Sequence, residues 1–74
     1  MLDPRDPAIW YYRGLLEARR ADFESAILFQ SRSLAIRESN EALLEREKCE
    51  RRTGRIAEAE ADAQRRKQLY PSQE

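Results

Sequence analysis

The chain has 74 residues, and its 14 Lys and Arg balance its 14 Asp and Glu. This length allows one small domain at most, and the zero net charge gives no long-range attraction to nucleic acid or to an anionic membrane. Charged residues make up 38% of the chain and strong helix formers dominate it, which predicts an all-α fold of solvent-washed helices.

The cysteine usage and the apolar pattern bear on the compartment. Cys49 is the single cysteine, which excludes an intramolecular disulfide and a cysteine-cluster metal site. The sequence has no run of about 18 apolar residues, and its first residues lack the apolar core of a signal peptide. We therefore expect a cytoplasmic protein with no membrane segment.

The first half of the chain predicts a helical hairpin. Asp6 can cap a helix that begins at Pro7 and runs to about Arg20. Apolar residues cover more than half of its circumference, so this helix should be packed on two sides. Asp22 is the next N-cap, for a helix over about 23–37, and the short break between the two helices predicts an antiparallel pair.

The second half predicts another hairpin. Ser39 and Asn40 mark a break before a helix over about 41–52, and Gly54 suits the left-handed conformation that follows a helix. The last helix is expected over about 55–69, ending before Pro71. Its expected inner residues are Ile56, Ala59, Ala63 and Leu69.

An offset of 33 residues aligns the two hairpins. It places Phe23 on Ile56, Ala26 on Ala59 and Ala21 on Gly54. A period in the thirties with two helices per unit is typical of helical repeat proteins. The aligned pairs further include Trp10 with Leu43, Ile36 with Leu69, and the identities Arg13 with Arg46, Glu17 with Glu50, Arg19 with Arg52 and Arg32 with Arg65.

These residues resemble the tetratricopeptide repeat family. Trp10 and Gly14 match the first helix of that repeat, and the segment 21–27 is similar to its turn and second-helix start. The second unit matches at Gly54, Ile56, Ala59 and Pro71, and Leu2-Asp3-Pro4 resembles the close of a preceding unit. The resemblance implies one domain over 1–74, with repeats over about 7–39 and 40–73. It also implies two antiparallel hairpins, or four helices, stacked as a short right-handed solenoid.

Packing explains these residue types. Gly14 is expected to let a neighbouring backbone approach, and Ala26 and Ala59 to lie where helices cross closely. Where the family usually has Leu and Tyr on the first helix, both units have Arg and Glu. The pairs are Arg13 with Glu17 and Arg46 with Glu50, whose i, i+4 spacing allows a local ion pair worth a few tenths of a kcal/mol.

Catalytic and metal chemistry find little support in the sequence. There is no glycine-rich phosphate loop, and no His that could activate Cys49 as a nucleophile, so Cys49 is expected to be a small buried apolar residue, with a reactive thiol as the alternative. Glu58, Glu60 and Asp62 are spaced two residues apart, which points them to different sides of a helix. We expect no enzyme activity, no cofactor and no metal. Acidic residues interleave the basic ones, which favours a solvated face over a nucleic-acid site.

The resemblance implies a protein-binding groove, because the first helices of tetratricopeptide units line a concave surface that binds a partner's peptide or helix. The groove would be aromatic and apolar at one end and basic at the other, which suits an acidic segment with an apolar anchor. Alternatively, Tyr11 and Leu15 belong to the core and the basic residues only aid solubility. The residues expected in the groove are Tyr11, Tyr12, Leu15, Arg19, Leu44, Lys48, Arg51 and Arg52.

Self-association is the alternative function. Two units are fewer than the three or so that stabilise a repeat array, and the apolar first helix asks for a neighbour. A homo-oligomer or a structural segment of a longer helical-repeat protein would provide one. Since neither Pro nor Gly lies between Arg37 and Glu41, the second and third helices could also fuse and exchange hairpins between two chains.

Overall fold

The computed structural model describes residues 3–71, which form four helices. They are α1 (Pro7–Arg19), α2 (Phe23–Ile36), α3 (Asn40–Arg52) and α4 (Ile56–Leu69). Each bound lies within one residue of the bound that the sequence predicts. Leu2, which belongs to the expected remnant of a preceding repeat, and residues 72 and 73, at the expected end of the second repeat, lie outside the described residues.

Local capping explains where three of the helices begin. Asp6, Asp22 and Ser39 each accept a hydrogen bond of 3.0–3.1 Å from a backbone amide in the first turn of α1, α2 and α3. Ser39 adopts extended backbone, so α2 and α3 are two separate helices in the single chain. Exchange of hairpins between two chains stays a prediction. Gly54 has a φ of 80°, as predicted, and Ala21 has a φ of 63° in the equivalent turn.

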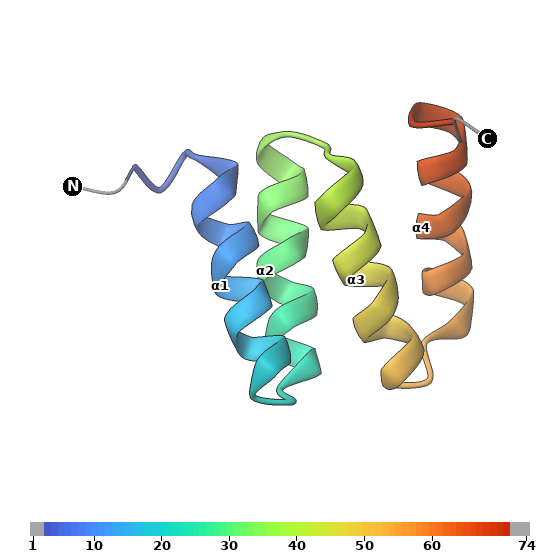
Figure 1. Cartoon of the computed structure of the whole chain (residues 1–74), viewed down its shortest axis with the longest axis horizontal. Helices are drawn as coiled ribbons and strands as arrows, with labels where there is room; N and C mark the ends of the chain where they lie inside the picture. The colour runs from blue at the N-terminus through green and yellow to red at the C-terminus, as the bar shows by residue number, and fades with distance from the viewer. Residues whose placement is uncertain (1–2, 72–74) are drawn as a thin grey trace.

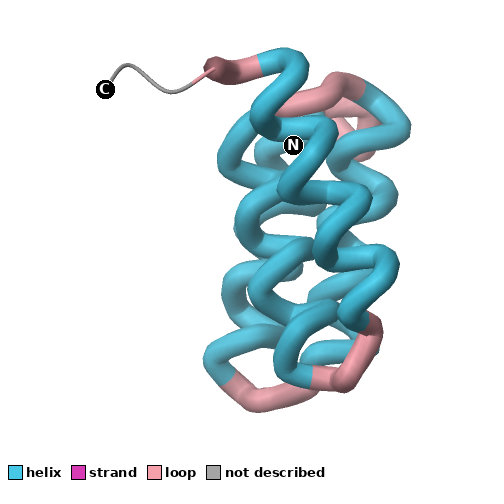
Figure 2. Tube along the Cα trace, turned by 90° about the vertical axis from the view of Figure 1, so that its right-hand side faces the viewer, coloured by secondary structure: helices cyan, strands magenta, loops and turns pink. Residues whose placement is uncertain are grey.

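The fold is all-α, and its helices form two antiparallel hairpins, α1 with α2 and α3 with α4 (Figure 1). The hairpins meet through α2 and α3, with a smaller contact between α1 and α3. Across residues 3–71, α1 and α4 do not touch, so the helices pack mainly in chain order. The four helices run up and down, with loops at both ends (Figure 2). The principal extents are 39 × 25 × 20 Å.

A side chain, and not a backbone, fills the space beside Gly14. The Gln30 side chain lies over this glycine and donates a 3.1 Å hydrogen bond from Nε2 to the carbonyl oxygen of Tyr11. The prediction that a neighbouring backbone approaches Gly14 was therefore wrong. The buried side-chain amide of Gln30, on α2, takes that space instead. Ala26 beside it is fully buried, as expected for a crossing point.

An aromatic stack replaces the expected ion pair of the first hairpin. Trp10 stacks on Phe29 with 5.9 Å between ring centroids, and the Arg13 guanidinium lies 4.9 Å from the Phe29 centroid. Glu17 pairs instead with Arg20 at 3.5 Å. The expected Arg13–Glu17 pair is absent from the described residues because the ring faces hold the guanidinium by a cation–π contact.

The outer side of α1 is not packed by the described part of the chain. Tyr12 is 64% exposed and Leu16 is 47% exposed. The expected packing of α1 on two sides is present, against α2 and, over a smaller contact, against α3, but it leaves Tyr12 and Leu16 exposed. Within residues 3–71, no further helix covers the rest.

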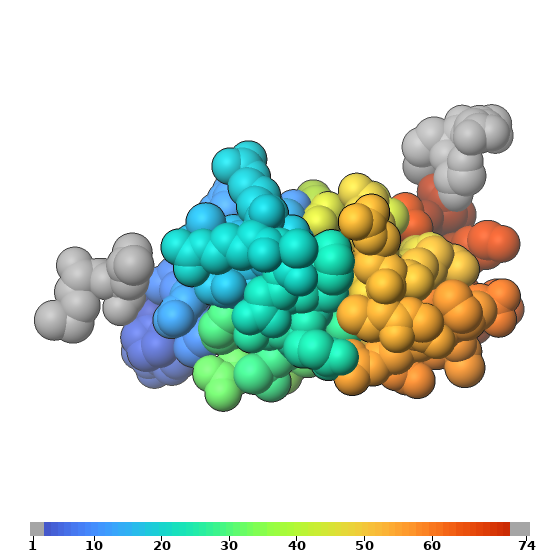
Figure 3. All heavy atoms as spheres, turned by 90° about the horizontal axis from the view of Figure 1, so that it is seen from below, coloured from blue at the N-terminus to red at the C-terminus, as the bar shows by residue number. Residues whose placement is uncertain are grey.

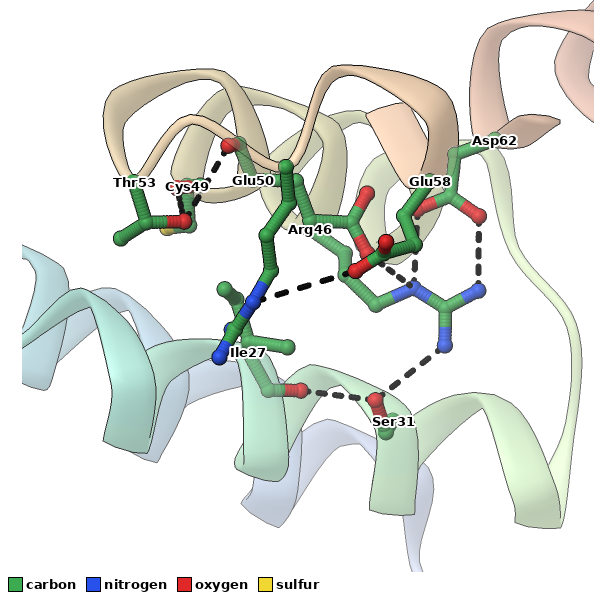
Figure 4. A network of polar contacts seen from close by, with 9 residues as sticks. Ile27, Ser31, Arg46, Cys49, Glu50, Thr53, Glu58 and Asp62 are labelled. Atoms are coloured by element: carbon green, nitrogen blue, oxygen red, sulfur yellow. Dashed lines mark hydrogen bonds and ion pairs between the residues drawn. The ribbon is translucent and has the colours of Figure 1, made fainter. Parts of the chain in front are cut away.

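Ion pairs and small residues hold the second hairpin together. Ala59 is fully buried and Ala63 is half-buried, as predicted, but Ile56 and Leu69 are exposed. Asp62 takes the inner position instead, because its carboxylate bonds the guanidinium of Arg46 on α3 (Figure 4). The inner face of α4 is therefore partly polar.

Candidate functional site

Two hollows of about 380 Å³ each lie along the face shared by α1 and α3. The first, here called the tyrosine hollow, is near the start of both helices. Its lining residues are Pro7, Ala8, Tyr11, Tyr12, Ser33, Arg37, Ser39 and Glu41. The second, here called the phenylalanine hollow, is near the end of both helices. Its lining residues are Ala18, Phe23, Glu45, Lys48, Cys49, Arg51 and Arg52.

The phenylalanine hollow has an apolar floor. Ala18 and Phe23 are half-buried and Cys49 is 3% exposed, so three elements contribute to it: α1, the start of α2, and α3. This is the end of the molecule seen in Figure 3, where atoms near the α1–α2 turn lie beside atoms near the α3–α4 turn. An apolar side chain entering the hollow would cover the exposed parts of Ala18 and Phe23 and remove them from water.

Basic side chains rim the same hollow. Lys48 pairs with Glu45 at 3.3 Å, and Arg51 pairs with Glu47 at 3.0 Å. The Arg52 guanidinium lies 5.1 Å from the centroid of the Phe23 ring. All three cations are exposed, so they remain accessible to a carboxylate in spite of these partners.

The thiol in the floor is poorly suited to nucleophilic chemistry. Burial raises the pKa of Cys49, and the charges of Glu45 and Glu50 raise it further. A thiol with a raised pKa stays protonated near neutral pH, and the thiolate is the nucleophile. Cys49 therefore serves as an apolar floor residue.

The tyrosine hollow is more polar. Tyr11 is half-buried and packs edge-on against Tyr12, with 5.3 Å between ring centroids. Burial, followed by the charges of Glu45 and Glu41, raises the pKa of Tyr11, so its hydroxyl is neutral and can donate or accept a hydrogen bond. Arg37 adds a cation to the wall.

The structure divides the predicted groove residues into three groups. Tyr11 and Tyr12 line the tyrosine hollow. Lys48, Arg51 and Arg52 line the phenylalanine hollow. The others line neither hollow: Leu15 and Leu44 are half-buried, and Arg19 is exposed.

The expected division into one apolar end and one basic end is replaced by a different one. The phenylalanine hollow combines an apolar floor with a basic rim, while both signs of charge border the tyrosine hollow through Arg37 and Glu41. The sequence did not predict Phe23 as a binding-site residue. Phe23 lies on α2, whereas the resemblance implies a groove formed by the first helix of each unit. Its place directly after the turn at Asp22 was the available signal, since that turn brings it beside the end of α1.

A buried polar cluster lies away from both hollows (Figure 4). Arg46 donates to the two carboxylate oxygens of Asp62 at 2.9 and 2.7 Å, and to Ser31 Oγ at 3.2 Å. The expected pair of Arg46 with Glu50 is present at 3.7 Å, but it is secondary to the Asp62 contact.

The pKa values of the two carboxyl groups in the cluster are shifted in opposite directions. Burial, together with a hydrogen bond to Asp62, raises the pKa of Glu50 to about 8. Burial also acts to raise the pKa of Asp62, but hydrogen bonds from Arg46 and Glu50 outweigh it and lower that pKa. Such a pair is common at catalytic sites. Here both side chains are nearly fully buried and line neither hollow, and the Arg46–Asp62 contact links α3 to α4.

Among residues 3–71, no group of three or more His, Cys, Asp or Glu side chains is placed to hold a metal ion. None of the described helices is long and apolar enough to cross a membrane.

Comparison with known proteins adds nothing to this geometry. No protein family, curated protein or solved structure matches the chain. The resemblance to the tetratricopeptide repeat therefore stands only on the residues quoted for it.

Proposed function

We propose that the chain is a non-catalytic protein-interaction module, and that it binds a peptide or helix of a partner protein along the face shared by α1 and α3. The observation that carries this proposal is the phenylalanine hollow, in which an apolar floor lies inside a rim of three exposed cations. Binding sites of this kind commonly combine an apolar anchor pocket with charged groups that orient the ligand.

We also infer that the two hairpins are tetratricopeptide-like units stacked as a short right-handed solenoid. Packing in chain order supports this inference, as do the fully buried alanines at the equivalent positions 26 and 59. In such a stack the first helices, α1 and α3, lie on one side, which is where both hollows are found.

The chemistry of the phenylalanine hollow selects an acidic ligand with one apolar anchor. Lys48, Arg51 and Arg52 outnumber the single carboxylate of Glu45 in its lining. An aromatic or large aliphatic side chain would cover Phe23 and Cys49, and flanking carboxylates would meet the rim. Each exposed ion pair formed in this way is worth about 0.2–1 kcal/mol, so the anchor must supply most of the affinity.

The experiment uses eight-residue peptides of Glu and Asp that carry a central Phe, Leu or Ala, titrated into the chain while amide chemical shifts are recorded. We expect the Phe peptide to bind most tightly and to shift amides around Ala18, Phe23 and Cys49. Lys48→Glu should weaken this binding at least threefold. The matched control Lys67→Glu, on the exposed side of α4, should have no effect.

Three results would refute the proposal. Equal binding of the Ala peptide would show that charge alone attracts the ligand. Shifts confined to other surfaces would place the site elsewhere. An absence of binding by all three peptides would exclude the proposed ligand chemistry.

A further inference from the structure

The 33-residue offset relates an exposed face of α1 to a buried face of α3. Here the outer face of α1 means Ile9, Arg13, Leu16 and Arg20. The offset places Ile9 on Ala42 and Leu16 on Cys49. Ala42 is fully buried and Cys49 is 3% exposed, whereas Ile9 is only half-buried and Leu16 is 47% exposed. The chain therefore keeps large apolar residues on α1 at positions that α3 buries.

Arginine contacts show what is missing on this face. Arg46 bonds Asp62 within its own unit and Ser31 on the preceding helix, α2. The offset places Phe29 on Asp62, and Arg13 lies over the ring of Phe29 just as Arg46 meets Asp62. Within the described part of the chain, Arg13 makes no hydrogen bond equivalent to the one that Arg46 donates to Ser31. The contact to a preceding helix is thus the one that Arg13 lacks.

At the other end of the row of four helices, the outward positions of α4 differ in chemistry from the equivalent positions of α2. Ser31 of α2 bonds Arg46 of α3, and Ile27 and Leu34 lie on the same side of α2, four residues before Ser31 and three after it. All three residues are half-buried. Their equivalents on α4 are Glu60, Gln64 and Lys67, all exposed. Polar residues at these outward positions are stable in water without a further helix against them. In a second copy of this chain, Glu60, Gln64 and Lys67 therefore offer no aliphatic side chain that could cover Ile9 and Leu16 as Ile27 and Leu34 would.

We infer that the outer face of α1 binds an amphipathic helix of a partner, one that carries aliphatic residues seven positions apart and a hydrogen-bond acceptor four positions after the first. The aliphatic residues would cover Ile9 and Leu16, and the acceptor would bond Arg13, as Ser31 bonds Arg46. Arg20 on the same face and Arg32 beside Trp10 favour a carboxylate among the acceptors. This surface is separate from the two hollows, so the inference does not depend on the proposed function.

The chain itself supplies the probe and its control. The probe is a synthetic peptide of residues 23–37, held helical by a hydrocarbon crosslink between positions 28 and 32, which are exposed in the folded protein. The control peptide has the sequence of residues 56–70 with a crosslink between the equivalent positions 61 and 65. Binding to the intact chain is measured by fluorescence anisotropy, and the site is mapped by amide chemical shifts.

The 23–37 peptide should bind and shift the amides of Ile9, Arg13 and Leu16, and the 56–70 peptide should not bind. Leu16→Lys should weaken binding at least tenfold. Leu28→Lys, at a position that is 50% exposed on α2, should leave binding unchanged. Both variants change exposed leucines, so both should fold.

Four outcomes would overturn the inference. One is an absence of binding by the 23–37 peptide. A second is equal binding of the two peptides, and a third is binding that Leu16→Lys does not weaken. The fourth is a dimeric mass in light scattering that Leu16→Lys converts to a monomer, because a second copy would then cover this face.

Discussion

Replacing Glu50 with Gln should increase the free energy of unfolding at pH 7. The Glu50 side chain is 6% exposed, and its Oε1 is buried without a hydrogen-bond partner. Arg46 compensates for a charge there only in part, because its two shortest bonds go to Asp62 and its Nε lies 3.7 Å from Glu50 Oε2. Burial therefore raises the pKa of Glu50 to about 8, and the acid is neutral in the folded chain at pH 7.

The raised pKa fixes the sign of the pH dependence. Below pH 4.5, the ordinary pKa of Glu, the folded and unfolded states both hold the proton and the full stability is present. Between pH 4.5 and about 8 only the folded state holds it, so stability falls as pH rises. At pH 7, which is 2.5 units above 4.5, the loss amounts to about 3 kcal/mol at 1.36 kcal/mol per unit.

Glu50→Gln removes this loss, because the Gln amide is neutral at every pH and can donate to Asp62 as the protonated acid does. Urea unfolding at pH 5, 6 and 7 should show a gain that grows from about 1 to about 3 kcal/mol. Asp62 is present in both the unchanged protein and the Glu50→Gln variant. The effect of its own titration therefore largely cancels when their free energies of unfolding are compared. The matched control Glu17→Gln, at the equivalent half-buried position of α1, should change stability by no more than about 0.5 kcal/mol at pH 7.

Two results would refute this reasoning. A loss of stability in Glu50→Gln at pH 7 would mean that Glu50 is ionised and bound to Arg46 in the folded chain. A gain of equal size at pH 5 and pH 7 would mean that the change acts through packing and not through the proton.

Three further experiments test the packing and the turns. Gly14→Ala should destabilise the chain by about 1–3 kcal/mol in thermal unfolding, because the new Cβ would lie 2.9 Å from Gln30 Cδ, and adding Gln30→Ala should recover part of the loss. Ala21→Gly should raise the melting temperature, since φ is 63° there, whereas Gly54→Ala, at a φ of 80°, should lower it. A change of melting temperature in the same direction in both variants would refute the argument from backbone strain. Cys49 should react with a thiol reagent at pH 7 far more slowly than the same residue in urea, because burial raises its pKa; equal rates would contradict its burial.

Helix positions could be predicted from the sequence because their signals are local. Asp6, Asp22 and Ser39 cap helices whose first turns follow directly, and Gly54 marks the one turn where glycine takes a positive φ. Each signal acts over a few residues and does not depend on the rotation of a helix about its axis.

The partner of Arg46 could not be predicted because it depends on that rotation. The i, i+4 spacing offers Glu50, whereas Asp62 becomes the partner only once α4 turns it toward α3. The same rotation carries Ile56 and Leu69 to the outside, against the apolar pattern. The candidate site behaves likewise. Basic residues of α3 could be chosen from the repeat, but the floor residue Phe23 comes from α2.

Because the helices pack mainly in chain order, the last helix, α4, can unfold locally. Among the four helices, α4 contacts α3 alone, and its contacts with α3 include the ion pairs Arg46–Asp62 and Arg66–Glu47. This helix can separate while α1, α2 and α3 stay packed, so its amides should exchange with solvent deuterium before those of α2. Because salt screens partly exposed ion pairs such as Arg66–Glu47, raising the ionic strength should widen the difference in exchange.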